Sequence, residues 1–109
     1  MDLSQLEQEL EDVSERYART NGIERDSNWY TLKLHEEVGE LTQAYLMKTG
    51  QARSKGLSQV EIEDNFKAEI ADVFAHILLL ARHHGVDVLG AVDDKWLRWH
   101  PSRAEPANS

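Results

Sequence analysis

Apolar residues recur along the first hundred positions at the three- and four-residue spacing of amphipathic helices. The first group consists of Leu3, Leu6, Leu10, Val13 and Tyr17. This helix is expected to end at Asn21-Gly22, a pair typical of helix C-termini. At its start, Ser4 followed by Glu7 matches a capping box. The pattern therefore predicts a first helix that carries these apolar residues and ends near Asn21-Gly22.

A second apolar stripe follows Asp26 and Ser27, either of which suits the N-cap of a helix. Its members share one helical face and are Leu34, Val38, Leu41 and Tyr45. The helix is expected to end near Thr49-Gly50. Residues 49–57 are polar and contain two glycines, so they are predicted to form a loop.

The third segment begins with Ser58-x-x-Glu61, which matches a capping box, and should end at Gly85. Residues 70–81 are apolar on nearly every side, and the exceptions are Asp72 and His76. A helix of this kind is typical of a central, buried position. The third helix is therefore predicted to be the core of the fold.

A fourth helix is predicted over residues 88–99, with Asp87 as its N-cap. The two prolines are Pro101 and Pro106, so none interrupts a helix before them. We predict an all-α fold, a single small four-helix bundle-like domain over residues 1–100, with a disordered tail at 101–109. The apolar surface exceeds what one small bundle covers, so a homo-oligomer, a dimer or a tetramer, is expected to complete it.

The composition excludes several classes of protein. The chain has 109 residues, a formal net charge of -8 and no cysteine. Excess acid and scattered basic residues argue against binding of a nucleic acid polymer. The longest apolar run, 77–81, is far shorter than the roughly 20 residues of a membrane helix, and residues 1–12 lack a signal-peptide pattern. We expect no membrane association and a cytoplasmic location.

The acids that carry chemical information are those on the second and third helices. Glu37 and Glu40 lie three residues apart, and Glu69 and Asp72 repeat this spacing. Measured around the helix from Leu34, Glu37 lies about 60° from the apolar stripe and Glu40 about 120°. Glu37 is therefore expected at the border of the core.

Two antiparallel helices can direct these four carboxylates at one point. Oxygen donors without sulfur suit a hard cation, which here means Mg²⁺, with Mn²⁺ as a substitute. Asp72, inside an apolar segment, would need a counter-charge from a metal or from Lys or Arg of another helix. The sequence thus predicts a metal centre between the second and third helices.

Acidic pairs also occur on solvated helix faces, and we assign Glu7, Glu9, Glu11 and Glu15 of the first helix to that role. A non-enzymatic helical interaction module, in which the acids only solvate the surface, therefore stays an alternative. A carboxylate-bridged di-iron bundle is disfavoured because it needs Glu-x-x-His pairs, and the chain has none.

Two strings, Glu36-Glu37-x-x-Glu40 and, after a gap of 28 residues, Glu69-x-x-Asp72, are similar to the EExxE…ExxD signature of the MazG-like all-α nucleoside triphosphate pyrophosphohydrolases. Residues 95–101, Lys-Trp-Leu-Arg-Trp-His-Pro, resemble the C-terminal basic segment of that family. Family members often carry an asparagine shortly before the basic pair, where this chain has Asp93-Asp94. The resemblance covers residues 29–101.

The resemblance implies Mg²⁺-dependent cleavage between the α- and β-phosphates of a nucleoside triphosphate, giving a monophosphate and pyrophosphate. The metal ligands would be Glu37, Glu40, Glu69 and Asp72. Lys95 and Arg98 would meet phosphate charge. A role in removing non-canonical or surplus nucleotides fits this reaction. The alternative within the same chemistry is phosphoribosyl-ATP pyrophosphohydrolase of histidine biosynthesis, whose acidic motif is similar.

Further candidates follow from their positions near these acids. Glu36 points most outward and is the candidate general base that accepts a proton from water. Lys33, one turn before Glu37, is placed either to reach a substrate phosphate or to pair with Glu37. Trp29 is the candidate for stacking on a base. His76, one turn after Asp72, is assigned either to support of Asp72 or to the core.

Overall fold

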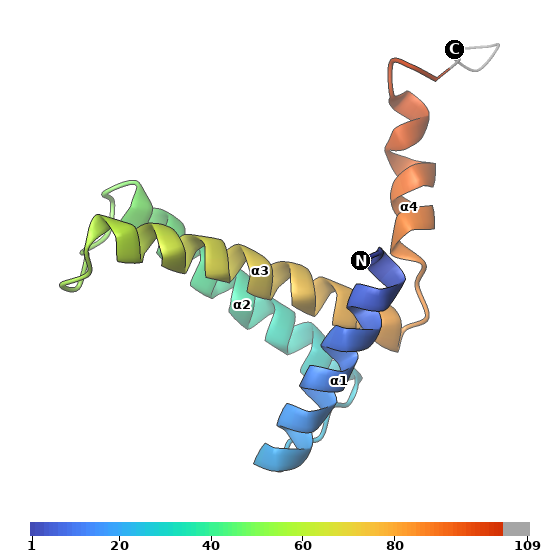
Figure 1. Cartoon of the computed structure of the whole chain (residues 1–109), viewed down its shortest axis with the longest axis horizontal. Helices are drawn as coiled ribbons and strands as arrows, with labels where there is room; N and C mark the ends of the chain where they lie inside the picture. The colour runs from blue at the N-terminus through green and yellow to red at the C-terminus, as the bar shows by residue number, and fades with distance from the viewer. Residues whose placement is uncertain (104–109) are drawn as a thin grey trace.

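The computed structural model describes residues 1–103, and these residues form helices joined by loops (Figure 1). The helices are α1 (Leu3–Asn21), α2 (Ser27–Lys48), α3 (Gln59–His83) and α4 (Val88–Lys95), followed by the 3₁₀ turn η1 (Leu97–Trp99). The prediction of an all-α fold is confirmed. The fourth predicted helix is divided at Trp96 into α4 and η1.

Side-chain caps fix the helix starts. Asp26, Ser58 and Asp87 each accept a hydrogen bond from a backbone N–H in the first turn of α2, α3 and α4. The start of α1 differs from the prediction, because Asp2 accepts from the backbone N–H of Gln5 at 2.8 Å and forms the capping box. The helix already begins at Leu3, so Ser4 lies inside its first turn and cannot cap it.

α2 and α3 form an antiparallel hairpin. At the loop end, Lys48 Nζ lies 2.6 Å from a carboxylate oxygen of Glu63, and at the other end Ser27 Oγ lies 3.0 Å from Nε2 of His83. The buried apolar residues come mainly from this pair, with one from α1, and they are Ala18, Tyr30, Ala44, Ile62, Leu78 and Leu79. The hairpin is therefore the body on which the other helices are placed.

The buried face of α2 is rotated from the predicted stripe. Its buried residues are Tyr30, Glu37 and Ala44, which recur every seven positions, whereas Val38 and Tyr45 are 43% and 48% exposed. A seven-residue repeat is the pattern of two helices that pack nearly side by side along their length. α3 therefore contacts the Tyr30–Ala44 face, on which Glu37 is buried.

α1 crosses the end of the hairpin where α2 begins and α3 ends (Figure 1). The guanidinium of Arg25 makes two hydrogen bonds to the carboxylate of Glu11, at 2.7 and 2.9 Å, and one to Ser14 at 3.1 Å. The hydrogen bond from Arg25 lowers the pKa of Glu11. The expectation that Glu11 only solvates the first helix is therefore wrong, because it holds α1 against the start of α2.

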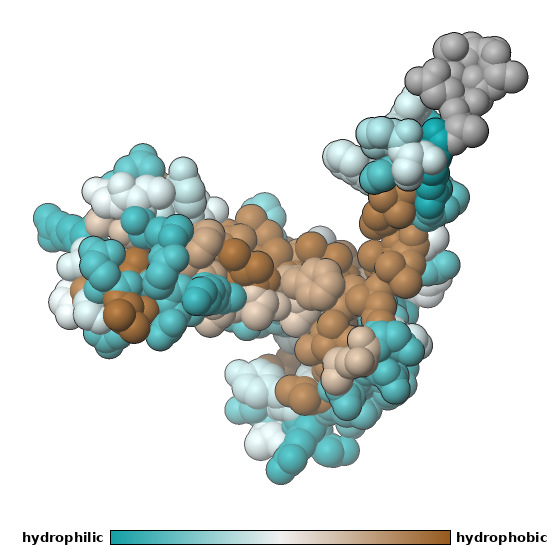
Figure 2. Space-filling model, turned by 45° about the horizontal axis from the view of Figure 1, so that its top comes forward, coloured by the Kyte–Doolittle hydropathy of each residue, from teal (hydrophilic) through white to brown (hydrophobic). Residues whose placement is uncertain are grey.

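α3 is less enclosed than predicted. Ile70, Phe74 and Ile77 are 47%, 48% and 40% exposed, because α2 covers one face of α3 and α1 crosses only its C-terminal part. α4 projects from the hairpin without covering this face (Figure 1). Hydrophobic residues consequently gather on the surface from α3 to the base of α4 (Figure 2). The radius of gyration is 17.8 Å, against about 13 Å for a compact domain of this length.

Beyond η1, residues 101–103 form a turn in which Arg103 pairs with Asp93 of α4 at 2.6 Å. The rest of the predicted disordered tail, residues 104–109, lies outside the described residues. Within residues 1–103, no helix combines the length and apolar character that a membrane span requires.

Candidate metal centre and adjoining hollow

Three of the four predicted metal ligands come together between α2 and α3. Glu37, Glu40 and Glu69 each place one carboxylate oxygen within 4.8 Å of the other two. The first two residues are neighbours on α2, one turn apart, and the antiparallel hairpin brings Glu69 of α3 opposite them. We call these three residues the carboxylate cluster. It is a set of hard oxygen donors of the kind that Mg²⁺ and Mn²⁺ prefer.

Asp72, the fourth predicted ligand, lies beside the cluster and outside the group of three. The expectation that Asp72 is buried is wrong, since its side chain is exposed and lines an open hollow. The buried acid is Glu37, which is only 7% exposed. Asp72 nevertheless remains close enough for its charge to raise the pKa of both Glu37 and Glu69.

The cluster carries more negative charge than its surroundings compensate. Burial, the neighbouring carboxylate of Glu40 and the charge of Asp72 raise the pKa of Glu37 to about 7. Burial, followed by the charges of Asp72 and Glu40, also raises the pKa of Glu69. Oε2 of Glu37 and Oε2 of Glu69 are buried and have no hydrogen-bond partner among the described residues. Buried, unpaired carboxylate oxygens of this kind fit a cation as their missing partner.

Lys33 is the nearest cation on α2. Its Nζ lies 3.4 Å from a carboxylate oxygen of Glu36 and 3.8 Å from one of Glu37. The predicted pairing with Glu37 is therefore present, whereas contact of Lys33 with a substrate phosphate stays a prediction. One ammonium group cannot neutralise Glu37, Glu40, Glu69 and Asp72 together.

A hollow of about 400 Å³ opens next to Glu37. It is lined by Leu10, Val13, Ser14 and Tyr17 of α1, by Trp29, Lys33 and Glu37 of α2, and by Asp72, Ala75, His76 and Leu79 of α3. Its volume falls in the range of about 300–1,000 Å³ of small-molecule sites. Its lining combines charged side chains with apolar and aromatic ones, so the hollow can take a ligand with both characters.

Trp29 lines this hollow, and its stacking on a base stays a prediction. The ring centroids of Trp29 and His76 are 6.1 Å apart in an edge-to-face arrangement, and the Trp29 and Tyr30 centroids are 5.0 Å apart. His76 is half-buried, and its Nδ1 is buried with no hydrogen-bond partner in the described chain. Burial, together with the nearby charge of Lys33, lowers the pKa of His76. His76 is therefore a neutral polar group in the wall of the hollow.

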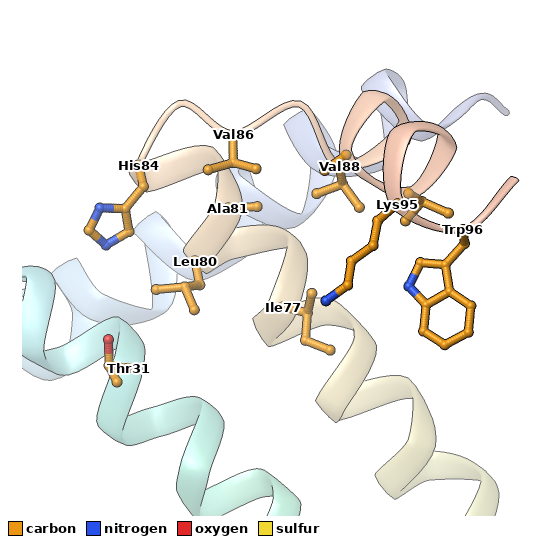
Figure 3. Close-up of a pocket in the computed structure, with 11 residues that line it drawn as sticks. Thr31, Ile77, Leu80, Ala81, His84, Val86, Val88, Lys95 and Trp96 are labelled. Carbon is orange, nitrogen blue, oxygen red and sulfur yellow. The ribbon is translucent and has the colours of Figure 1, made fainter. Parts of the chain in front are cut away.

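The structure does not bring the remaining candidates into the hollow. Glu36 is exposed and paired with Lys33. Lys95 lines a separate groove between α3 and α4, where it extends toward the side occupied by Ile77 (Figure 3). The guanidinium of Arg98 lies 4.8 Å from the ring centroid of Trp99 on η1. Phosphate binding by Lys95 and Arg98 stays a prediction, as does the role of Glu36 as a base.

Sequence reasoning missed the contribution of α1 to this site. Leu10, Val13 and Tyr17 were assigned to an ordinary apolar stripe, but they form one wall of the hollow. Val13 and Tyr17 remain 68% and 57% exposed, which is unusual for residues on the inner stripe of a helix. No single-helix pattern reveals this, because it depends on the angle at which α1 crosses the hairpin.

Comparison of the chain with protein-family models gave no match, and comparisons with curated proteins and with solved structures gave no match either.

Proposed function

We propose that the protein is a Mg²⁺-dependent nucleotide pyrophosphohydrolase, which cleaves the α–β phosphoanhydride of a nucleoside triphosphate. The products are a nucleoside monophosphate and pyrophosphate. The observation that carries the proposal is the carboxylate cluster, with unpaired buried oxygens on Glu37 and Glu69, next to the hollow of about 400 Å³. The resemblance of residues 36–40 and 69–72 to the MazG-like signature supports the same reaction.

Glu37, Glu40 and Glu69 would hold Mg²⁺, with Mn²⁺ as a substitute, and Asp72, which lines the hollow, would join them. When bound, the metal neutralises polyphosphate charge and makes a coordinated water more acidic. Lys33, which borders both Glu37 and the hollow, contributes positive charge where phosphate would lie. Glu36 is the acid of this helix turn that the cluster does not use, and we propose it as the proton acceptor.

The proposal is tested with a panel of nucleoside triphosphates and diphosphates in the presence of Mg²⁺, scored for release of pyrophosphate. We expect at least one triphosphate to give pyrophosphate and the matching monophosphate in equal amounts, with no release when a chelator removes the metal. Release of inorganic phosphate alone would contradict cleavage at the α–β bond.

Phosphoribosyl-ATP belongs in the same panel, because its pyrophosphohydrolase is the alternative within this chemistry. Turnover of phosphoribosyl-ATP alone would replace the proposal of triphosphate house-cleaning. No turnover and no metal binding would favour the non-enzymatic interaction module.

The proposal includes a homo-oligomer, a dimer or a tetramer. Ile70, Phe74 and Ile77 are exposed apolar residues of α3. Ile77 also shares a groove with Val92 of α4 and with Trp96, which follows α4. Exposed apolar surface shared by neighbouring elements is typical of subunit interfaces.

We expect the wild-type chain to be oligomeric by light scattering at micromolar concentration. Phe74→Asp should give a monomer with unchanged helix content by circular dichroism, because it puts a charge in the centre of the apolar face. Val60→Asp, at an exposed position near the start of the same helix, serves as the control and should leave the mass unchanged. A monomeric wild type would contradict the oligomer.

A further inference from the structure

A groove of about 550 Å³ lies between the C-terminal part of α3 and α4 (Figure 3). Each helix lines it with residues at positions i, i+3, i+4 and i+7, the spacing of one helical face. These residues are Ile77, Leu80, Ala81 and His84 from α3 and its C-cap, and Val88, Ala91, Val92 and Lys95 from α4. Two helix faces therefore line one open space.

The groove side of α4 is left without cover. The helix has eight residues, and a helix this short is not stable by itself in water. It projects from the hairpin (Figure 1), and Val92 and Trp96, which line the groove, are 41% and 68% exposed. A further helix laid along the groove would contact both faces at once, which is the helix-in-groove mode of peptide recognition.

The charge of the groove selects the kind of helix that fits. The chain has 20 acidic residues against 12 lysines and arginines, but no acid is among the described residues that line the groove. Lys95 extends across it toward the side of Ile77 (Figure 3) and forms no ion pair within residues 1–103. An apolar groove with an unpaired ammonium group complements a helix whose apolar face is bordered by carboxylates.

We propose that the groove between α3 and α4 binds an acidic amphipathic helix of another protein. Apolar side chains of that helix pack against Ile77, Val88 and Val92, and a carboxylate beside them pairs with Lys95. Binding covers the apolar side of α4 and fixes its position relative to α3. The partner is thus recognised by a pattern of apolar and acidic positions.

This surface is separate from the proposed hydrolytic site. No residue of the carboxylate cluster or of the hollow beside it lines the groove. The inference therefore goes beyond the proposed function, and its test needs neither Mg²⁺ nor a nucleotide. Ile77 is shared with the exposed apolar residues of α3 that are proposed to pair copies of the chain, but Phe74 does not line the groove. Phe74→Asp can therefore remove the oligomer without changing a groove residue.

The probe is a fluorescein-labelled synthetic peptide of about 15 residues, the length at which an isolated helix starts to form. It has leucine at positions i, i+3, i+4 and i+7 and glutamate on the opposite face. One control peptide has lysine in place of glutamate, and the other has the same composition in scrambled order. Fluorescence anisotropy with the full chain measures binding. We expect wild type and Phe74→Asp to bind the acidic peptide at micromolar concentration and more tightly than either control peptide.

Three variants test the contacts. Lys95→Glu should weaken binding of the acidic peptide roughly three- to tenfold and strengthen binding of the lysine peptide, because the charge beside the apolar face is reversed. Val92→Asp should weaken both peptides about tenfold or more, because it puts a charge among the apolar contacts. Leu89→Asp is the matched control, since Leu89 is 63% exposed on α4 and does not line the groove. It should bind the acidic peptide as wild type does.

Equal binding of the acidic, lysine and scrambled peptides would overturn the proposal. Unchanged binding of the acidic peptide in Lys95→Glu or in Val92→Asp would do the same. Light scattering on Val92→Asp gives a further check, because a fall to the monomer mass would show that a second copy of the chain fills the groove. We expect the mass of Val92→Asp to equal that of wild type. None of these results depends on whether the protein releases pyrophosphate.

Discussion

Glu37→Gln is expected to abolish pyrophosphate release and, at the same time, to stabilise the metal-free chain. The carboxylate of Glu37 is 7% exposed, shares its surroundings with Glu40 and Asp72, and leaves Oε2 without a partner. Glutamine keeps the shape and removes the charge, so the repulsion within the cluster falls. Metal affinity falls with it, because a ligand is lost, and activity should drop about 100-fold or more.

The stabilisation follows from the pKa of Glu37. The difference between about 7 in the folded chain and the ordinary value of 4.5 corresponds to about 3 kcal/mol of stability lost on ionisation. Glu37→Gln avoids this loss, but its buried amide also needs hydrogen-bond partners, so the net increase in stability is smaller. We expect the melting temperature of the metal-free protein at pH 8 to rise by about 5 °C or more.

Glu36→Gln is the matched control for stability alone, since Glu36 is the adjacent residue on α2 but is exposed and outside the cluster. Its melting temperature should change little. Calorimetry and a pyrophosphate assay on the same preparations decide the outcome. Full activity in Glu37→Gln would contradict the proposed metal centre. A lower melting temperature in this variant would show that Glu37 has a stabilising partner.

The second large effect is a dependence of stability on both pH and Mg²⁺. An acid whose pKa is raised by folding binds its proton more tightly in the folded chain, so stability falls as pH rises. For Glu37 the fall begins near the unfolded value of 4.5 and is complete above about 7. The raised pKa of Glu69 acts in the same direction. Metal-free protein should therefore be less stable at pH 8 than at pH 5.5.

Mg²⁺ should reverse this loss, because it binds the ionised cluster in the folded chain and not the unfolded chain. A concentration one hundred times the dissociation constant adds about 2.7 kcal/mol. Thermal denaturation is measured at both pH values, with and without Mg²⁺. The four melting temperatures test the sign of the pH effect and of the Mg²⁺ effect. We expect the metal to stabilise strongly at pH 8 and weakly at pH 5.5. Equal stabilisation of wild type and Glu37→Gln at pH 8 would place the ion elsewhere.

The sequence predicted the helices well because their signals are local. Asp26, Ser58 and Asp87 cap helices where they were expected, and the Asn21-Gly22 pair ends α1. The missed cap at Asp2 is also local, since Asp and Ser are nearly equivalent at this position. The meeting of Glu37 and Glu40 with Glu69 was predicted from spacing alone, because the antiparallel hairpin leaves few other arrangements.

Features that depend on how helices face one another were predicted less well. Asp72 was expected to be buried because its neighbours are apolar, yet those neighbours, such as Ile70 and Phe74, are themselves half exposed in the single chain. An apolar segment shows that burial is favoured, but it does not show whether the same chain or another one buries it. The crossing of α1, which makes Val13 and Tyr17 part of the hollow, is accompanied by the Arg25–Glu11 pair and has no signal in periodicity.

The projection of α4 divides the tryptophans of the chain between two places. Trp29 lies in the hollow, whereas Trp96 and Trp99, the other two, are 68% and 64% exposed on α4 and η1. Indole emission depends on the polarity around the ring, so intrinsic fluorescence carries two separable signals. In a Trp96→Phe/Trp99→Phe double variant, only Trp29 fluoresces, so quenching of its emission reports occupancy of the hollow. In Trp29→Phe, a blue shift of the remaining emission as the protein is concentrated reports contact made by α4.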